Sequence, residues 1–318
     1  MDISVLQKKK KRRSSPRNLP IISAKVKHLF IKKPSSINPD ILNSSIRLNR
    51  QSPINFNRGA LPKKKFELTF PHLRTKYSKK VLICFGIVDY LYWPKLQNAT
   101  NDVNAFSKFA KNKLGFDIVY VFNNENVTKS SIEKIITHDL YKIADVEDLI
   151  VMSFHGHGHS INFDNFTEGF LVPYDAPKSP TPFELISMNN LSKWFKYIKS
   201  NHVLLLLDCC FSGLSVLREK PEKIPEIITS NALNRHLESR SRIIINAGTQ
   251  DDCVADGGWN DNSIFTGALI SSPTFENNIG SVINLYYYLL TTVPRYCNQT
   301  PSIGKMEGDM GTDIFLKL

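Results

Sequence analysis

Cysteines and long apolar runs are both scarce in this sequence of 318 residues. An odd, sparse set of cysteines, two of them adjacent, argues against a disulfide framework and favours a reducing, intracellular environment. The five are Cys84, Cys209, Cys210, Cys253 and Cys297. No run of about 18 apolar residues occurs, which excludes a transmembrane helix, and no apolar segment follows the basic N-terminus, which excludes a secretory signal. We therefore expect a cytoplasmic protein without a membrane span.

Acidic residues are nearly missing from the first quarter of the chain, and this divides the molecule. Residues 1–80 contain 21 Lys and Arg against 3 Asp and Glu, a net of +18, whereas the remaining residues contain 20 against 26, a net of −6. The basic charge therefore belongs to an N-terminal tail. It does not make the folded part a nucleic-acid-binding domain.

Residues 1–78 are predicted to be a basic, largely disordered N-terminal region. Ser, Asn, Pro and Lys recur without a sustained hydrophobic period, so this region cannot bury enough apolar surface to offset the entropy lost on ordering. The run KKKKRR at positions 8–13 is typical of a nuclear-localisation signal or an anion-binding arm. The partners expected for this run are an import receptor or anionic molecules, and a nuclear location is the alternative to a cytoplasmic one. A solvated tail without a partner fits the same charge run equally well.

Apolar strands and amphipathic helices alternate after residue 80. The strands are expected at 81–88, 116–123, 148–154, 202–208 and 241–248, with a last edge strand at 312–318. The helices are expected at 101–114, 128–144, 187–200, 263–271 and 281–293. Continuously apolar strands that alternate with helices are typical of an open, mostly parallel sheet covered on both faces, so residues 79–318 are predicted to form an α/β domain.

Two reactive side chains follow neighbouring predicted strands. His157 comes after the strand at 148–154, and Cys210 after the strand at 202–208. In open α/β sheets the active site lies beyond the carboxyl ends of the strands. A thiolate nucleophile and an imidazole that protonates the leaving amine are the groups that cysteine proteolysis needs, and their separation of 53 residues is close to the roughly 50 of a caspase-type pair.

Three motifs in order make this a family resemblance. HGHG at 155–158, GFLVPYDA at 169–176 and DCCFSG at 208–213 resemble those of the metacaspases, which are caspase-fold cysteine peptidases, and the similarity covers roughly residues 80–318. The resemblance implies that His157 is the catalytic histidine and Cys210 the nucleophile. It also implies that the backbone amides of Gly158 and Cys210 bind the oxyanion, and that Cys209 only packs.

The same resemblance implies a substrate preference. Metacaspases cleave after Arg or Lys, because acidic residues line the first specificity pocket, and here Asp102 and Asp208 match those residues, with a weaker match at Asp256. A basic P1 side chain between carboxylates gains charge-assisted hydrogen bonds. The Gln-Ala-Cys motif of aspartate-specific caspases is absent. The expected partners are therefore polypeptides with Arg or Lys at P1, although Asp102 by itself also fits a helix N-cap.

Metal binding is not expected from the sequence. Calcium, which many metacaspases need, requires several oxygen ligands in one place, and the loop after His157 offers only Asp164 and Glu168 before Asp175. The triplet His155, His157 and His159 lacks the further ligands of a zinc site. His155, where the family usually has Ser, and His159 are interpreted as exposed loop histidines. We expect no cofactor.

Two alternatives concern activity and processing. Phe211 stands where many relatives have His, so an inactive caspase-like scaffold is the alternative to a peptidase. A polar linker at 217–240 joins a large-subunit-like part (79–216) to a small-subunit-like part (241–318), and a basic-specific peptidase could cleave itself there. Its basic residues include Arg218, Lys220, Lys223 and Arg235.

Overall fold

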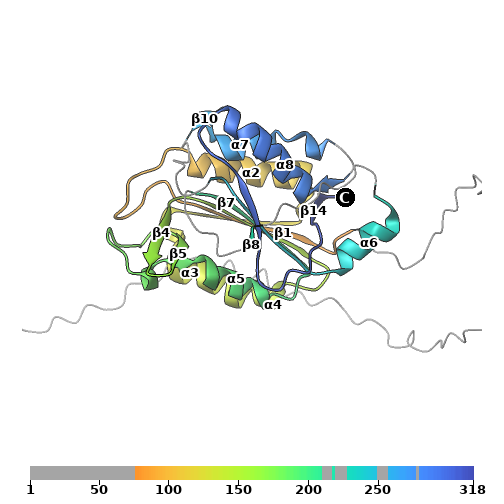
Figure 1. The fold of residues 1–318 in the computed structure, drawn as a ribbon, viewed down its shortest axis with the longest axis horizontal. Coiled ribbons are helices and arrows are strands. Elements are labelled where there is room, and N and C mark those ends of the chain that lie inside the picture. The colour runs from red at the N-terminus through yellow and green to blue at the C-terminus, as the bar shows by residue number, and fades with distance from the viewer. Residues whose placement is uncertain (1–75, 210–216, 219–227, 249–256, 277–278) are drawn as a thin grey trace, which may run out of the picture. The chain divides into compact units, whose positions relative to one another are not determined.

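A seven-stranded sheet forms the centre of the molecule in the computed structural model (Figure 1). The structure describes residues 76–209, 217–218, 228–248, 257–276 and 279–318. The predicted N-terminal region, except for its last three residues, lies outside the described residues. So do Cys210, Phe211, Lys220, Lys223, Cys253 and Asp256.

The strand order in the central sheet is β2-β1-β3-β7-β9-β13-β8. The strands are β1 (Lys80–Gly86), β2 (Ile118–Asn123), β3 (Leu149–His155), β7 (His202–Asp208), β8 (Leu217–Arg218), β9 (Ser241–Asn246) and β13 (Ser302–Lys305). The first five strands in the order run parallel, while β13 is antiparallel to both of its neighbours. The predicted α/β fold with a mostly parallel sheet is confirmed.

Helices cover both faces of this sheet, because its strands are apolar on both sides. Along β1, for example, Leu82 and Cys84 enter one hydrophobic cluster, whereas Val81, Ile83 and Phe85 enter the other. The first cluster contains α2 (Ala99–Lys113), α6 (Ser230–Glu238), α7 (Ile264–Ile270) and α8 (Val282–Thr292). The second contains α3 (Lys129–Lys134), the π-helical turn Ile135–Leu140 and α5 (Met188–Lys196), with α4 (Tyr141–Ile143) packed alongside. Figure 1 shows α2, α7 and α8 above the sheet and α3, α4 and α5 below it.

Hydroxyl side chains begin most of these helices. Thr128 caps α3 and accepts a hydrogen bond from the Ser131 amide. Four other helices start in the same way, with caps at Ser187, Thr229, Ser263 and Ser281. Each side chain satisfies an amide that has no partner within its own helix, which fixes where the helix begins.

The remaining strands differ from expectation. The sequence was interpreted as a loop after His157, but β4 (Gly158–Phe163), β5 (Phe166–Leu171) and β6 (Ile186–Ser187) form an antiparallel sheet there. The final strand β14 (Phe315–Lys317) pairs with β12 (Gly280–Ser281) instead of the edge of the central sheet. A small hairpin joins β10 (Gly258–Trp259) to β11 (Asn262–Ser263). Single 3-10 turns occupy Asn124–Asn126, Pro182–Glu184, Pro273–Phe275 and Val293–Arg295.

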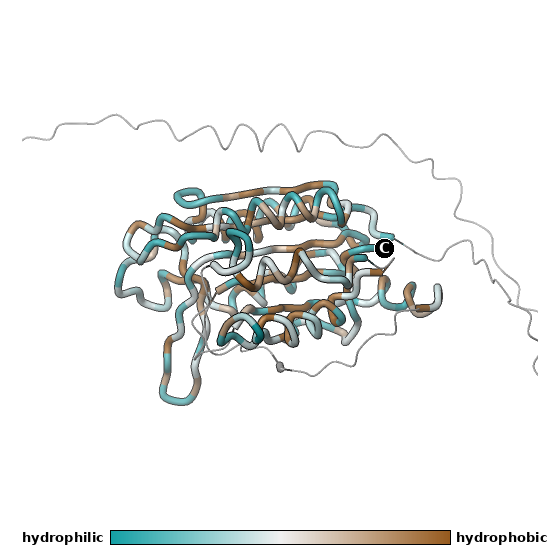
Figure 2. Tube along the Cα trace, turned by 90° about the horizontal axis from the view of Figure 1, so that it is seen from above, coloured by the Kyte–Doolittle hydropathy of each residue, from teal (hydrophilic) through white to brown (hydrophobic). Residues whose placement is uncertain are grey.

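Hydropathy follows this layered arrangement. Figure 2 shows hydrophobic residues concentrated in the strands and helices, and hydrophilic residues in many of the connecting loops. None of the helices in the described part of the chain has the length and apolar character needed to cross a lipid bilayer.

Candidate active site

The ends of β3 and β7 lie side by side in the centre of the sheet. The two strands are parallel and in register, with His155 directly opposite Asp208. Side chains at paired positions of parallel strands project from the same face, so these two meet. His157 follows two residues after β3 ends, and Cys209, the residue after β7, is buried. The expected edge of the sheet therefore brings together the motifs that were singled out from the sequence.

The His157 side chain is held by the segment that follows β1. Its Nε2 lies 2.8 Å from the carbonyl oxygen of Pro94, and its ring packs against Tyr90 and Trp93, with centroid separations of 4.8 and 5.6 Å. A carbonyl oxygen only accepts hydrogen bonds, so Nε2 carries the proton, and in the neutral ring Nδ1 is the basic nitrogen. Pro94 thus fixes both the tautomer and the orientation of His157.

Tyr90 fixes the backbone on which His157 stands. Its hydroxyl accepts a 2.7 Å hydrogen bond from the His157 amide and donates to the Val172 carbonyl at 3.2 Å. Burial raises the pKa of Tyr90, which keeps the hydroxyl neutral and able to do both. A Cβ on the neighbouring Gly156 would lie 2.5 Å from the Tyr90 hydroxyl oxygen. Glycine is therefore required where the chain turns between β3 and His157.

Asp102, His155 and Asp208 form a buried group, which we call the carboxylate–histidine cluster. They come from the first turn of α2 and the ends of β3 and β7. Each residue has one side-chain nitrogen or carboxylate oxygen that lies within 4.8 Å of those of the other two. Ser263 bridges the two acids, because its amide donates to Asp102 Oδ1 at 2.9 Å and its hydroxyl to Asp208 Oδ2 at 2.5 Å. The start of α7 thereby positions both carboxylates.

The two oxygens of Asp208 have very different surroundings. Oδ2 accepts hydrogen bonds from Ser263 and from Thr266 Oγ1 at 2.9 Å, and it lies 3.5 Å from His155 Nδ1. Oδ1 is buried and has no hydrogen-bond partner among the described residues, and the same holds for His155 Nε2. The prediction that His155 is an exposed loop histidine is wrong, because register with Asp208 places it in the interior with only 4% of its surface exposed.

His159 also differs from its expected place. It lies in β4, half-buried, and its ring meets that of Trp93 edge-on at a centroid separation of 5.5 Å. Burial lowers the pKa of His159, which favours the neutral ring. Of the three histidines in HGHGH, only His155 joins the carboxylate–histidine cluster, whereas His157 and His159 both pack against Trp93.

The structure thus brings Asp102 and Asp208 together, and it places His157 between β3 and β4 and Gly158 at the start of β4. Cys210 and Asp256 are not tested, because they lie outside the described residues. The sequence reasoning missed four supporting residues, namely Tyr90, Pro94, Ser263 and Thr266. Only Ser263 left a signal, as the first residue of a predicted helix.

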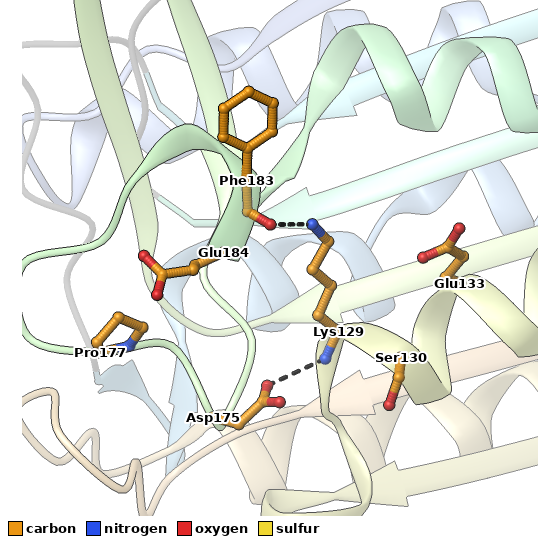
Figure 3. A pocket seen from close by; sticks show the side chains of 7 residues that line it. All are labelled: Lys129, Ser130, Glu133, Asp175, Pro177, Phe183 and Glu184. Carbon is orange, nitrogen blue, oxygen red and sulfur yellow. Dashed lines mark hydrogen bonds between the residues drawn. The ribbon is translucent and has the colours of Figure 1, made fainter.

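A surface cavity of about 340 Å³ lies elsewhere, at the start of α3 (Figure 3). Lys129 enters it, with its ammonium group donating to the Phe183 carbonyl and its amide to Asp175 Oδ1 at 3.1 Å. None of the predicted catalytic or substrate-binding residues lines this cavity. It therefore does not compete with the sheet edge as the candidate active site.

Comparison with known protein families agrees with this arrangement. The family model described as the caspase domain matches residues 79–303. The chain belongs to the caspase-domain family of cysteine peptidases. This caspase domain is similar to a crystal structure of protein GSU0716 from Geobacter sulfurreducens, with a TM-score of 0.52 and 15% sequence identity over 72% of this chain and 93% of that one. At that identity the likeness concerns the fold alone. No curated protein matched the caspase-domain chain.

Proposed function

We propose that this caspase-domain protein is a metacaspase-type cysteine endopeptidase that cleaves peptide bonds after Arg or Lys. The observation that carries the proposal is Asp208. Its carboxylate is buried at the end of β7, immediately before the Cys209–Cys210 pair, and one of its oxygens has no partner among the described residues.

A basic P1 side chain supplies what Asp208 lacks. A buried carboxylate oxygen without a donor is costly, and a guanidinium or ammonium group that enters with N–H donors removes that cost. Asp102 adds a second acidic group within 4.8 Å. Charge-assisted hydrogen bonds to two carboxylates favour Arg and Lys over neutral side chains at P1. The negative charges of the same carboxylates repel an acidic P1 side chain and so exclude it.

His157 and Cys210 perform the chemistry in this proposal. The Cys210 thiol gives its proton to His157 Nδ1, and the resulting thiolate attacks the carbonyl carbon of the basic P1 residue. The amides of Gly158 and Cys210 stabilise the oxyanion. His157 then protonates the leaving amine, which breaks the C–N bond and leaves a thioester. A water molecule gives a proton to His157 and attacks the thioester, which releases the acid and restores the thiol.

Hydrolysis of fluorogenic peptides with Arg, Lys or Asp at P1 tests this proposal. We expect cleavage after Arg and Lys only, lost in Cys210→Ala and in His157→Ala but retained in Cys297→Ala, which removes a thiol outside the site. Assays with calcium and with a chelator test the expected independence of cofactors. Cleavage after Asp, or activity in Cys210→Ala, would contradict the proposal. If no peptide is cleaved with or without calcium, the inactive scaffold replaces it.

The fold reduces the number of basic residues within 217–240 after which the enzyme could cleave itself. Proteases bind substrates in extended form, but Arg235 lies in α6, and Arg218 lies in β8 paired with β13. We therefore propose Lys223 as the residue after which the active enzyme cuts itself, because Lys220 is followed by Pro221 and the carbonyl of Arg240 is already bonded to the Met310 amide. Intact-mass analysis after incubation should give two fragments with wild type and one chain with Cys210→Ala. A stable single chain in both would remove the idea.

A further inference from the structure

The carboxylate–histidine cluster contains a residue that the proposed peptidase chemistry does not use. We propose that Asp102, His155 and Asp208 bind a divalent transition-metal ion, with zinc as the best match. The three side chains project from α2, β3 and β7 into one buried place, and their donor atoms lie within 4.8 Å of one another.

The spacing of the donors fits one metal ion. Zinc binds imidazole nitrogen and carboxylate oxygen at about 2.0–2.2 Å, so two ligands of a tetrahedral ion lie about 3.4 Å apart. His155 Nδ1 and Asp208 Oδ2 are already separated by 3.5 Å. Asp102 is within 4.8 Å of both, and a side-chain shift of about 1 Å brings it to the ligand distance.

Unpartnered atoms in the cluster are the second observation. Asp208 Oδ1 and His155 Nε2 are both buried without a hydrogen-bond partner among the described residues. Only 2% of the Asp208 side chain and 5% of the His155 side chain are exposed, so bulk water does not serve them. Such atoms are rare in folded proteins because each one costs free energy. A cation that also contacts Asp208 Oδ1 would satisfy that oxygen, while His155 would bind the ion through one ring nitrogen, and two carboxylates with a neutral imidazole would balance its charge of +2.

Surrounding hydrogen bonds hold the ligands as metal sites require. Ser263 donates to both carboxylates, through its amide to Asp102 and its hydroxyl to Asp208, and Thr266 adds a further bond to Asp208. Bonds of this kind orient ligand groups and tune metal affinity. His155 also sets the metal class, because imidazole suits zinc, copper and nickel, whereas sites for calcium and magnesium use oxygen ligands.

Metal binding would block the peptidase site. The ion and a basic P1 side chain would use the same carboxylates, so zinc should inhibit cleavage competitively by raising KM. This consequence rests on the proposed function, whereas the binding of the metal does not. The two claims can therefore fail separately.

Titration of full-length Cys210→Ala protein with Co²⁺, followed by displacement with Zn²⁺, tests the site without any need for activity. This variant removes the thiol of the proposed nucleophile and leaves Cys209, the buried thiol directly after Asp208, in place. We expect one Co²⁺ per chain, with a tetrahedral absorption spectrum that lacks thiolate charge transfer. Adding His155→Ser should weaken binding at least about 100-fold, because loss of a direct ligand exceeds the 10- to 100-fold loss for a supporting residue.

The matched control is His159→Ser, which removes a neighbouring histidine of the same motif and should leave affinity unchanged. Asp102→Asn is a second variant that keeps an oxygen to accept from the Ser263 amide, and it should weaken binding at least about 10-fold. Thermal unfolding without metal shows that each variant folds. Absence of binding, thiolate absorption, or equal affinity in His155→Ser would overturn the proposal. With active wild type, a zinc-dependent rise in KM for P1 Arg peptides tests the competition separately.

Discussion

Two buried aspartates in this protein are held by the same local device, yet they have opposite surroundings. Ser263 caps α7 and donates its hydroxyl to Asp208, while Ser281 caps α8 and donates its hydroxyl to Asp313, in both cases at 2.5 Å. Each serine also accepts a hydrogen bond from the amide three residues later, at 3.0 and 3.1 Å. In both places a capping serine therefore links the first turn of a helix to a buried carboxylate through its hydroxyl group.

The difference lies in the second oxygen of each carboxylate. Asp313 Oδ1 accepts from the amides of Ile283 and Ile314 at 3.1 and 2.8 Å, so both of its oxygens are satisfied. Asp208 Oδ1 has no such donor among the described residues. A carboxylate that is fully bonded by its own chain is structural, whereas one with a buried, unbonded oxygen is suited to an external cation. The serine cap alone does not tell the two apart.

Replacing each acid by its amide should separate the two roles most clearly. Asp208→Asn should lower kcat/KM for P1 Arg peptides by roughly 30-fold or more, because breaking a buried charge pair costs about 2–5 kcal/mol. Asp313→Asn should change it less than about twofold, since a structural residue makes no contact with substrate. Steady-state kinetics on both variants measures this. Equal losses would mean that Asp208 acts only through folding.

Removing the capping hydroxyls should lower the free energy of unfolding more at Ser281 than at Ser263, which is the opposite of the order expected for activity at Asp313 and Asp208. Ser281→Ala removes a cap worth about 1 kcal/mol and leaves Asp313 Oδ2 without its side-chain donor, which costs about 1–3 kcal/mol more. Ser263→Ala should cost less, because Thr266 still donates to Asp208 Oδ2. Urea denaturation of both variants gives the two free energies of unfolding. A larger loss for Ser263→Ala would reverse the assignment of roles.

The pH dependence of stability gives a test that is specific to Asp313. Burial raises the pKa of Asp313 from 3.8 to about 7, against the lowering effect of its hydrogen bonds. The folded state therefore binds this proton more tightly than the unfolded state. The stabilisation is complete below about pH 4 and is lost as the pH rises to about 7, at about 1.4 kcal/mol per pH unit. Urea denaturation across this range should show wild type losing stability relative to Asp313→Asn. Parallel curves would contradict the shift.

The central sheet was predictable because its strands are buried on both faces. The runs at 81–88 and 202–208 are continuously apolar, and the structure places β1 and β7 there. Shorter strands lacked that signal. The hairpin of β4 and β5 is only partly buried over most of its length, and β13 has only four residues, one of them Gly304. The final strand was found, but nothing in its own sequence encodes its pairing with β12.

Candidate site residues can be named from the sequence where a side chain would carry the chemistry. Asp102, His157 and Asp208 were singled out from motifs, because each expected role needs a particular residue type, and the structure places the two aspartates close together. The carbonyl of Pro94 has no such signature, since every residue offers one. His155 was misinterpreted because HGHGH resembles a glycine-rich loop, and only the register between β3 and β7 places it in the interior.

The hydrogen bonds of Ser263 restrict which residues can replace it during evolution. Helix caps ordinarily exchange among Ser, Thr, Asp and Asn with little loss, and the caps Ser187 and Thr229, which bond no carboxylate among the described residues, have that freedom. Aspartate at 263 would set a third negative charge beside Asp102 and Asp208. Alanine would give up both the helix cap and the bond to Asp208. Lineages that keep both carboxylates are thus confined at this position to an uncharged capping residue that can also donate to Asp208.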